Sequence, residues 1–248
     1  MTVSAEERQD FLPGNERMIH QRSDIFSYSM DAVLLAKFAR VSGAKRIIDL
    51  CAGTGAVPLM LSLRTKAKIE AMELQPLLCG LFERSIITNE LSRQISVKEG
   101  DLRILQGMEL GKYDLVTCNP PYFPVTAAKG VNENEWKTIA RHEVSCTLTD
   151  AVAAAAALVK SKGKVAFVHR PERAAEIFAI MNQYHLAPKR IKYVHPKLTK
   201  AANIVLIEAV KDGNPGLTTE APWVVYAEDG TYQKEFYKEY FEGGRTNE

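Results

Sequence analysis

The sequence predicts an α/β fold in which a mostly parallel sheet of seven strands carries helices on both faces and ends in an antiparallel strand. Between residues 46 and 194, short apolar runs alternate with longer stretches of helical periodicity, the pattern of β–α–β units. No helix fits between the last two apolar runs, so they are expected to pair as an antiparallel hairpin. No internal repeat and no linker rich in Pro, Gly and Ser divides the chain. We therefore expect one domain over residues 1–248, with an N-terminal segment at 1–45, a core at 46–210 and a C-terminal extension at 211–248.

The first half of the core predicts three strands and two helices. Each strand is a short run in which apolar residues are continuous or alternate, and each of the first two is followed by a helical pattern. Pro76 fits the first turn of the second helix, where its missing N–H costs no hydrogen bond. The elements are, in order, a strand at 46–51, a helix at 56–63, a strand at 68–73, a helix at 75–89 and a strand at 95–98.

The second half continues the alternation after a fourth strand. The long segment 123–145 that follows this strand has the length of a functional lid. Thr149 is the expected N-cap of an alanine-rich helix. The elements are a strand at 113–118, a helix at 151–160, a strand at 163–169, a helix at 172–183 and strands at 189–194 and 204–210, followed in the extension by a turn-rich segment at 212–216, a short segment at 223–226 and a last helix around 232–241.

Composition places the chain among ordinary globular proteins, with 46% apolar and 25% charged residues. The four cysteines are far apart and include no C-x-x-C pair, so neither a zinc site nor a disulfide framework is expected. No apolar run is long enough to span a membrane, and the first residues lack the pattern of a signal peptide. We expect a cytoplasmic protein that binds no metal and no membrane.

The net charge of +2 conceals an asymmetry between the two ends of the chain. Residues 208–248 carry a balance of −5, which leaves +7 on residues 1–207. The segment 186–207 contains no acidic residue, and it is either a surface that attracts a polyanion or simply a solvated face. Its basic residues are Lys189, Arg190, Lys192, Lys197 and Lys200.

The strongest functional signal is the tetrad Asn119-Pro120-Pro121-Tyr122, which directly follows the predicted strand 113–118. An exocyclic amine on a base is a poor nucleophile because its lone pair is delocalised into the ring. The Asn119 side-chain oxygen and the Pro120 carbonyl are acceptors for its two N–H hydrogens, and Tyr122 offers a face on which the base stacks. The competing interpretation is that Asn119 is a turn residue and that Pro-Pro-Tyr is only a stiff loop.

Acidic residues and glycines at the ends of the first three strands predict a nucleotide-like ligand. Gly53 and Gly55 follow the first strand, where they let the backbone approach a ligand closely. Glu73 ends the second strand, where a carboxylate accepts from both ribose hydroxyls. Asp101 follows the third strand and is placed to accept from an adenine amino group while Leu102 covers the ring. Asp49 has two interpretations: it contacts the methionine amine of a cofactor, or it caps the following helix.

This turn does not have the sequence of a dinucleotide or triphosphate site. A G-x-G-x-x-G pattern would need glycine where Cys51 and Pro58 stand, and no Gly-Lys-Ser/Thr follows. We therefore favour S-adenosylmethionine over NAD. Cys51 takes the first position of the usual G-x-G turn, so it must tolerate that backbone geometry without the freedom of glycine.

The residues 49–55, Glu73, Asp101 and 119–122 together resemble the class I, Rossmann-like amino-methyltransferases that carry a D/N-P-P-Y/F motif. Within them the chain resembles the bacterial family that methylates N6 of the adenine at position 37, next to the anticodon of a valine tRNA. The resemblance extends over residues 17–210 and includes the segments 26–36 and 141–143.

The resemblance implies S-adenosylmethionine as cofactor, RNA as partner, and methyl transfer to an adenine amino group in RNA, with tRNA favoured. The tetrad Asn119, Pro120, Pro121 and Tyr122 would be catalytic. The cofactor-binding residues would be Asp31, Asp49, Cys51, Ala52, Gly53, Thr54, Gly55, Glu73, Leu74, Asp101, Leu102 and Asn119. The RNA-contacting residues would be Lys129, Arg141, His142, Lys189, Arg190, Lys192, Lys197 and Lys200.

Three other functions are compatible with parts of the sequence. Through the same Asn-Pro-Pro-Tyr tetrad, the chain also resembles the release-factor-modifying family, whose members methylate a protein glutamine amide. Other base amino groups, in ribosomal RNA or DNA, are alternative acceptors. A non-catalytic RNA-binding module with the same fold would be expected to have lost Glu73, Asp101 or Asn119, and all three are present.

Overall fold

The computed structural model describes residues 7–22, 24, 25, 27–122 and 146–242. Seven long strands form one sheet in the order β5-β4-β3-β6-β7-β9-β8. The neighbours from β5 to β7 are parallel, whereas β9 is antiparallel to both β7 and β8. The strands are β3 (Arg46–Leu50), β4 (Lys68–Glu73), β5 (Ile95–Glu99), β6 (Tyr113–Cys118), β7 (Val159–His169), β8 (Leu186–His195) and β9 (Ile204–Lys211). The predicted sheet and its antiparallel last strand are confirmed.

Two further strands in the C-terminal extension were not expected. They are β10 (Thr218–Thr219) and β11 (Trp223–Val224), and both pair in parallel with β8. The sheet in the described part of the chain therefore has nine strands rather than the predicted seven. Each of the added strands is two residues long, too short to give a periodic signal in the sequence.

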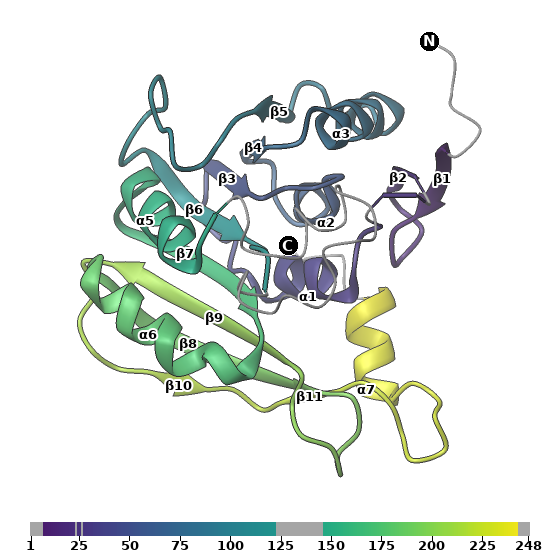
Figure 1. Cartoon of the computed structure of the whole chain (residues 1–248). Coiled ribbons are helices and arrows are strands. Elements are labelled where there is room, and N and C mark those ends of the chain that lie inside the picture. Colours follow the sequence, from purple (N-terminus) through teal and green to yellow (C-terminus); the bar gives the residue numbers. More distant parts are fainter. Residues whose placement is uncertain (1–6, 23, 26, 123–145, 243–248) are drawn as a thin grey trace.

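Helices cover both faces of the sheet (Figure 1). Neighbouring residues of β3 point to opposite faces: Ile47 joins one buried apolar cluster and Ile48 joins the other. The first cluster is shared with α1 (Met30–Phe38), α2 (Ala56–Ser62) and α3 (Pro76–Thr88), and the second with α5 (Leu148–Leu158) and α6 (Ala174–Gln183). The carboxyl ends of β3, β4, β5 and β6 therefore reach a common edge between two well-packed layers.

The N-terminal segment forms a hairpin for which no element was predicted. Strands β1 (Glu7–Phe11) and β2 (Met18–Arg22) pair antiparallel. The hairpin is tied to α3 by Glu7, which accepts hydrogen bonds from the Arg84 guanidinium at 2.8 and 2.9 Å. His20 contacts the same carboxylate at 2.8 Å and Thr88 Oγ1 at 2.9 Å.

Three boundaries differ from the prediction for identifiable reasons. The N-cap of α5 is Thr147 and not Thr149, because Thr147 forms a capping box with Asp150. Strand β7 begins at Val159, and its register with β6 shifts before it becomes regular, so the predicted start at 163 found only the regular part. Helix α6 is preceded by a short 3-10 turn at Pro171–Arg173.

The C-terminal extension packs aromatic rings against α1. It contains the short helix α7 (Lys234–Tyr237), drawn in yellow in Figure 1, which continues into a π-helical turn at Lys238–Glu242. The rings of Phe236 and Tyr240 are stacked with centroids 5.4 Å apart, and both are buried in the same apolar cluster as α1. The extension therefore stabilises the helix at whose beginning Asp31 lies.

Candidate functional site

A cavity of about 450 Å³ lies at the common edge where β3, β4, β5 and β6 end. Almost every residue that the sequence assigned to the cofactor or to catalysis lines it. The lining includes Asp31, Cys51, Ala52, Gly53, Thr54, Glu73, Leu74, Asp101, Leu102 and the tetrad Asn119, Pro120, Pro121 and Tyr122. Asp49 and Gly55 were also predicted, but neither lines the cavity.

The β3–α2 turn has the strained backbone that the sequence led us to expect at Cys51. This residue has a φ of +56°, in the left-handed region that disfavours a side chain. Gly53 and Gly55 follow with φ values of +55° and +89°. The Gly53 N–H donates to the Glu73 carboxylate at 2.8 Å, so the turn is tied to the end of the neighbouring strand.

The two glycines of this turn have different surroundings, which predicts different effects of an added methyl group. A Cβ on Gly53 would meet no atom within 4 Å, whereas a Cβ on Gly55 would lie 2.1 Å from the buried ring of Phe82. Gly53→Ala is therefore expected to cost about 1 kcal/mol of stability from backbone strain and to weaken cofactor binding, because it fills the cavity. Gly55→Ala adds a steric clash worth about 1–3 kcal/mol. Thermal unfolding together with cofactor calorimetry checks this, and equal melting temperatures for the two variants would contradict it.

Glu73 is positioned by two backbone groups. Its carboxylate accepts from Gly53 N–H at 2.8 Å and from Gln75 N–H at 3.0 Å, and the side chain is buried on the cavity wall. Burial raises the pKa of Glu73, and the backbone donors oppose that shift. A carboxylate has about four lone-pair sites, so two donors leave acceptor capacity toward the cavity.

Asp49 does not cap the following helix, as one interpretation of the sequence held. The N-cap position of α2 is Gly55. Asp49 is 1% exposed, and its carboxylate accepts from the Thr117 hydroxyl at 2.5 Å. Burial raises the pKa of Asp49 to about 8, although the Thr117 hydrogen bond opposes the shift.

The raised pKa of Asp49 predicts a stability that depends on pH. At a pH between 3.8, the ordinary pKa of Asp49, and about 8, its pKa in the folded protein, Asp49 is ionised in the unfolded chain but keeps its proton in the folded protein. The free energy of unfolding therefore falls as pH rises through this window. Asp49→Asn keeps an acceptor for Thr117 but cannot ionise. The melting temperature of this variant minus that of the wild type should therefore increase from pH 5 to pH 8. A constant difference between the two proteins across this range would contradict the assignment.

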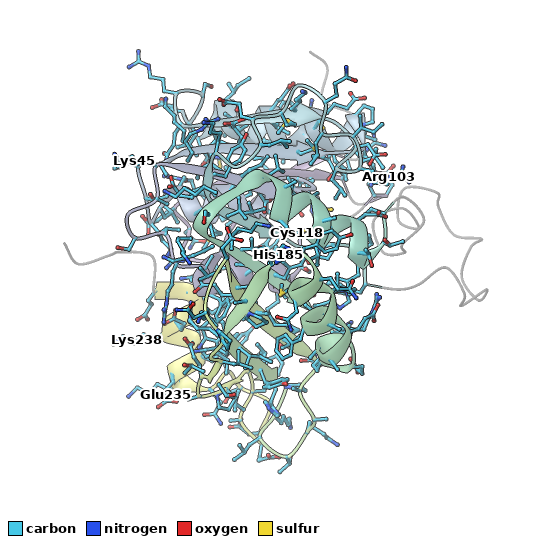
Figure 2. All side chains as sticks on the ribbon, turned by 90° about the vertical axis from the view of Figure 1, so that its left-hand side faces the viewer. Lys45, Arg103, Cys118, His185, Glu235 and Lys238 are labelled. Carbon is cyan, nitrogen blue, oxygen red and sulfur yellow. The ribbon has the colours of Figure 1, made fainter. Side chains whose placement is uncertain are left out.

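The tetrad follows the end of β6, directly after the fully buried Cys118, which is labelled in Figure 2. The Tyr122 hydroxyl lies 2.7 Å from Asn119 Oδ1 and 2.7 Å from Asp31 Oδ2. The Tyr122 ring is flanked by His169, with centroids 5.0 Å apart, and by the Arg170 guanidinium at 5.4 Å. Burial and the negative Asp31 raise the pKa of Tyr122 well above its usual value of 10, so the phenol keeps its proton.

Asp101 lies on the cavity wall with its carboxylate already engaged. Its Oδ1 accepts from Arg103 Nε at 3.0 Å and its Oδ2 accepts from Arg103 Nη2 at 2.5 Å, and this arginine lowers the pKa of Asp101. Arg103 lies at the periphery of the molecule in Figure 2. Asp101 is therefore charged and held in one orientation, while Leu102 beside it is buried and offers an apolar surface.

Eleven of the residues that line the cavity were not assigned to the site from the sequence, and three of them are Arg170, Gln75 and Tyr28. Arg170 follows β7, and Gln75 precedes α3. Tyr28 lies in the segment 26–36, and it both lines the cavity and packs on the core. The Gln75 side chain is 5% exposed, and its Oε1 has no hydrogen-bond partner among the described residues. A buried acceptor on the wall of a cavity is matched by a ligand that brings a donor, which the hydroxyls of a ribose would supply.

Two of the predicted RNA-contacting residues are structural. Arg190 is 7% exposed, pairs with Glu208 at 3.0 Å and Glu220 at 2.5 Å, and packs over the Phe38 ring. Lys192 pairs with Glu220 at 3.3 Å and lies over the Trp223 ring. The absence of acidic residues from 186–207 was misleading, because the partners come from β9 and from the extension.

The remaining predicted RNA contacts are at the surface or outside the described residues. Lys200 is exposed, and the ammonium of Lys197 donates to the Glu228 carbonyl at 2.8 Å. Lys189 donates to the Asn214 carbonyl. Lys129, Arg141 and His142, with the predicted lid at 123–145, lie outside the described residues.

Within the described residues, every helix is too short or too polar to span a membrane. Among the same residues, no group of three or more His, Cys, Asp or Glu side chains is arranged to hold a metal ion.

Comparison with known proteins identifies the family of this chain. The family described as "Methyltransferase small domain" matches residues 16–193. The chain is 29% identical over 213 residues to a protein of Parabacteroides distasonis, covering 84% of this chain and 89% of that protein, and 31% identical to one of Tolumonas auensis, covering 83% and 84%. Both relatives are named "tRNA1(Val) (adenine(37)-N6)-methyltransferase".

Solved structures give the same answer at the level of the fold. A predicted O-methyltransferase from Agrobacterium tumefaciens superposes with a TM-score of 0.69 at 25% identity, covering 88% of this chain and 97% of that one. The Pyrococcus horikoshii protein TYW2, solved in complex with MeSAdo, superposes with a TM-score of 0.61 at 15% identity, covering 86% and 74%. Because the family match extends over most of its length, this chain belongs to the methyltransferase small domain family.

Proposed function

We propose that this protein is an S-adenosylmethionine-dependent methyltransferase that modifies N6 of an adenine in tRNA, next to the anticodon. The observation that carries the proposal is the position of the Asn119 tetrad on the wall of the same cavity as Gly53 and Glu73. The cavity therefore contains both an amide oxygen that accepts from an amino group and the residues at the strand ends that suit a nucleotide. Two curated relatives with this activity in their names match more than four fifths of the chain.

The residues present fit S-adenosylmethionine. Glu73 and the unpartnered Gln75 oxygen would accept from the ribose hydroxyls, Gly53 leaves room at the turn, and Leu102 would cover the adenine ring. Asp101 would accept from the adenine amino group, and Asp31 adds a carboxylate to the cavity. When bound, this cofactor supplies a methyl group on a positively charged sulfur.

The chain's own contribution to the reaction is to position and polarise the acceptor amine. Asn119 Oδ1 and the Pro120 carbonyl accept its two N–H hydrogens, which draws the nitrogen lone pair out of conjugation with the ring. The Tyr122 ring offers a stacking face worth about 1–3 kcal/mol per base. No side-chain nucleophile is needed, because positioning and charge stabilisation are sufficient for in-line transfer.

The pair of acceptors favours an amine over a hydroxyl as the group that is methylated. A hydroxyl has one proton, so it would use only one of the two oxygens, whereas an NH₂ group uses both. An adenine in an RNA loop is also accessible at small cost, because such bases are already partly unstacked. The cytoplasm, where tRNA is found, is the corresponding location.

The test is incubation with methyl-labelled S-adenosylmethionine and separated tRNA, ribosomal RNA, DNA and release-factor protein, followed by nucleoside analysis. We expect label in N6-methyladenosine of valine tRNA. A transcript with guanine in place of the adenine at position 37 is the matched control and should take up no label. Label in the protein fraction alone would overturn the RNA assignment in favour of a glutamine amide, and label in ribosomal RNA or DNA alone would exclude tRNA.

A further inference from the structure

The Tyr122 hydroxyl is shared between two oxygens, and one of them is the oxygen that catalysis requires. It lies 2.7 Å from Asn119 Oδ1 and 2.7 Å from Asp31 Oδ2. A contact of this length between two oxygens needs a proton between them. The phenol has one proton, so it donates to only one of the two acceptors at a time.

These contacts allow two arrangements of the Asn119 amide. In the first, Tyr122 donates to Asn119 Oδ1, so the amide oxygen faces the tyrosine and is already used as an acceptor. In the second, Tyr122 donates to the Asp31 carboxylate, and its hydroxyl oxygen is then an acceptor. In the structure Oδ1 faces Tyr122, so this second arrangement requires a flip of the amide by about 180°. The flip turns the Asn119 NH₂ group toward the hydroxyl oxygen and Oδ1 to the opposite side of the amide.

Charge decides between the two arrangements. A carboxylate is a stronger acceptor than an amide oxygen, because hydrogen bonds to ionised groups are roughly twice as strong as neutral ones. The residues are also held in place: Asp31 lies in the first turn of the buried helix α1, and the Tyr122 ring contacts His169 and Arg170. The second arrangement is therefore favoured as long as Asp31 is present.

We infer that Asp31, acting through the Tyr122 hydroxyl, is a positioning residue that orients the Asn119 amide so that its oxygen is left for the amino group of the substrate. The inference rests on the proposed function only in one respect: the group that receives the methyl group must be an NH₂ group. It assigns Asp31 a role besides the cofactor contact implied by resemblance, and that contact would use the other carboxylate oxygen. It also gives a function to the tyrosine hydroxyl, which stacking alone does not need.

A double-mutant cycle tests this inference. In Asp31→Ala the hydroxyl has only Asn119 Oδ1 as acceptor, so the amide is held in the wrong orientation, and the single-turnover rate at saturating cofactor is expected to fall about tenfold. Tyr122→Phe removes the hydroxyl, so neither orientation of the Asn119 amide is favoured over the other. Its single-turnover rate is expected to fall about threefold. When Asp31→Ala is added to Tyr122→Phe, it should have no further effect. The double variant should therefore be faster than Asp31→Ala alone.

Two controls keep the cycle interpretable. Asp31→Asn keeps the size of the side chain and one acceptor oxygen, so its single-turnover rate should fall less than that of Asp31→Ala. In the Tyr122→Phe background, Asp31→Asn should not change the rate. Asp24→Ala removes a carboxylate from the same N-terminal segment, where Asp24 pairs with Arg22 at 2.6 Å, and should leave the rate unchanged. The affinity of every variant for S-adenosylhomocysteine is measured by calorimetry, because a cofactor contact of Asp31 would change it equally with and without the Tyr122 hydroxyl.

The outcomes separate this inference from the proposed function. The cycle is run on whichever fraction the wild type labels, since adenine and a glutamine amide both present an NH₂ group. Absence of label in any RNA would contradict the proposed function and leave the cycle measurable on the other acceptor. Independent, multiplicative losses of rate at Asp31 and Tyr122 would overturn the inference even if valine tRNA is the substrate.

Discussion

Asn119→Ala is expected to lower the rate of methyl transfer by about 100- to 1,000-fold, the cost of removing one preorganised polar group that stabilises a transition state. The amide oxygen is the acceptor that draws the amino group out of conjugation, and alanine offers none. Cofactor affinity should remain almost unchanged, because the cavity keeps Glu73, Gly53 and Gln75. Single-turnover kinetics and calorimetry with S-adenosylhomocysteine measure the two quantities separately.

Asn119→Asp is the matched control for this substitution. Aspartate has the same shape and keeps an acceptor oxygen, so it should retain more activity than alanine. Because Asn119 is only partly buried, both variants are expected to fold, which thermal unfolding checks. Turnover by Asn119→Ala close to that of the wild type would remove Asn119 from catalysis and with it the proposed function of the tetrad.

The core of the fold was predictable because its signals are local. The boundaries of β4 and β6 match the expected strands at 68–73 and 113–118, since each is an apolar run bounded by turns or a helix start. The N-terminal hairpin was not predictable. Its strands contain charged residues, and it is stabilised by the contact of Glu7 with Arg84, which are 77 positions apart in the sequence.

The site was predictable as far as the ends of parallel strands determine it. Glu73, Asp101 and Asn119 lie at or just after the ends of different strands, and parallel strands bring their carboxyl ends to one edge. Burial was not predictable in the same way. Asp49 is two residues from Cys51, yet it is buried and does not line the cavity, whereas Cys51 does.

The charge of a segment also proved a poor guide to its role. Arg190 belongs to a run without acidic residues, but its carboxylate partners Glu208 and Glu220 come from later parts of the chain. Arg170 shows a different difficulty, because it was not assigned to the site at all. It precedes a proline at the start of a predicted helix, so it reads as a boundary residue, whereas the fold places it on the cavity wall beside Tyr122.

Glu73→Ala is expected to give the reverse of the Asn119 result, weak cofactor binding with a nearly preserved rate once cofactor saturates. Hydrogen bonds to a charged group contribute about 1.5–3 kcal/mol each, so losing the ribose contacts corresponds to about a 100-fold or greater rise in Kd. The substitution also leaves the N–H groups of Gly53 and Gln75 without their acceptor, so some stability is lost as well. Calorimetry at a temperature where the variant is folded separates the two effects.

Glu70→Ala is the matched control on the same strand. Its carboxylate is about one third exposed and pairs with Arg46 at 3.0 Å, away from the cavity, so cofactor affinity should not change. Glu73→Gln, which keeps one acceptor oxygen, should fall between the wild type and Glu73→Ala. A Glu73→Ala protein that binds S-adenosylhomocysteine as tightly as the wild type would show that the ribose is not held at the end of β4, and the cofactor would have to lie elsewhere in the cavity.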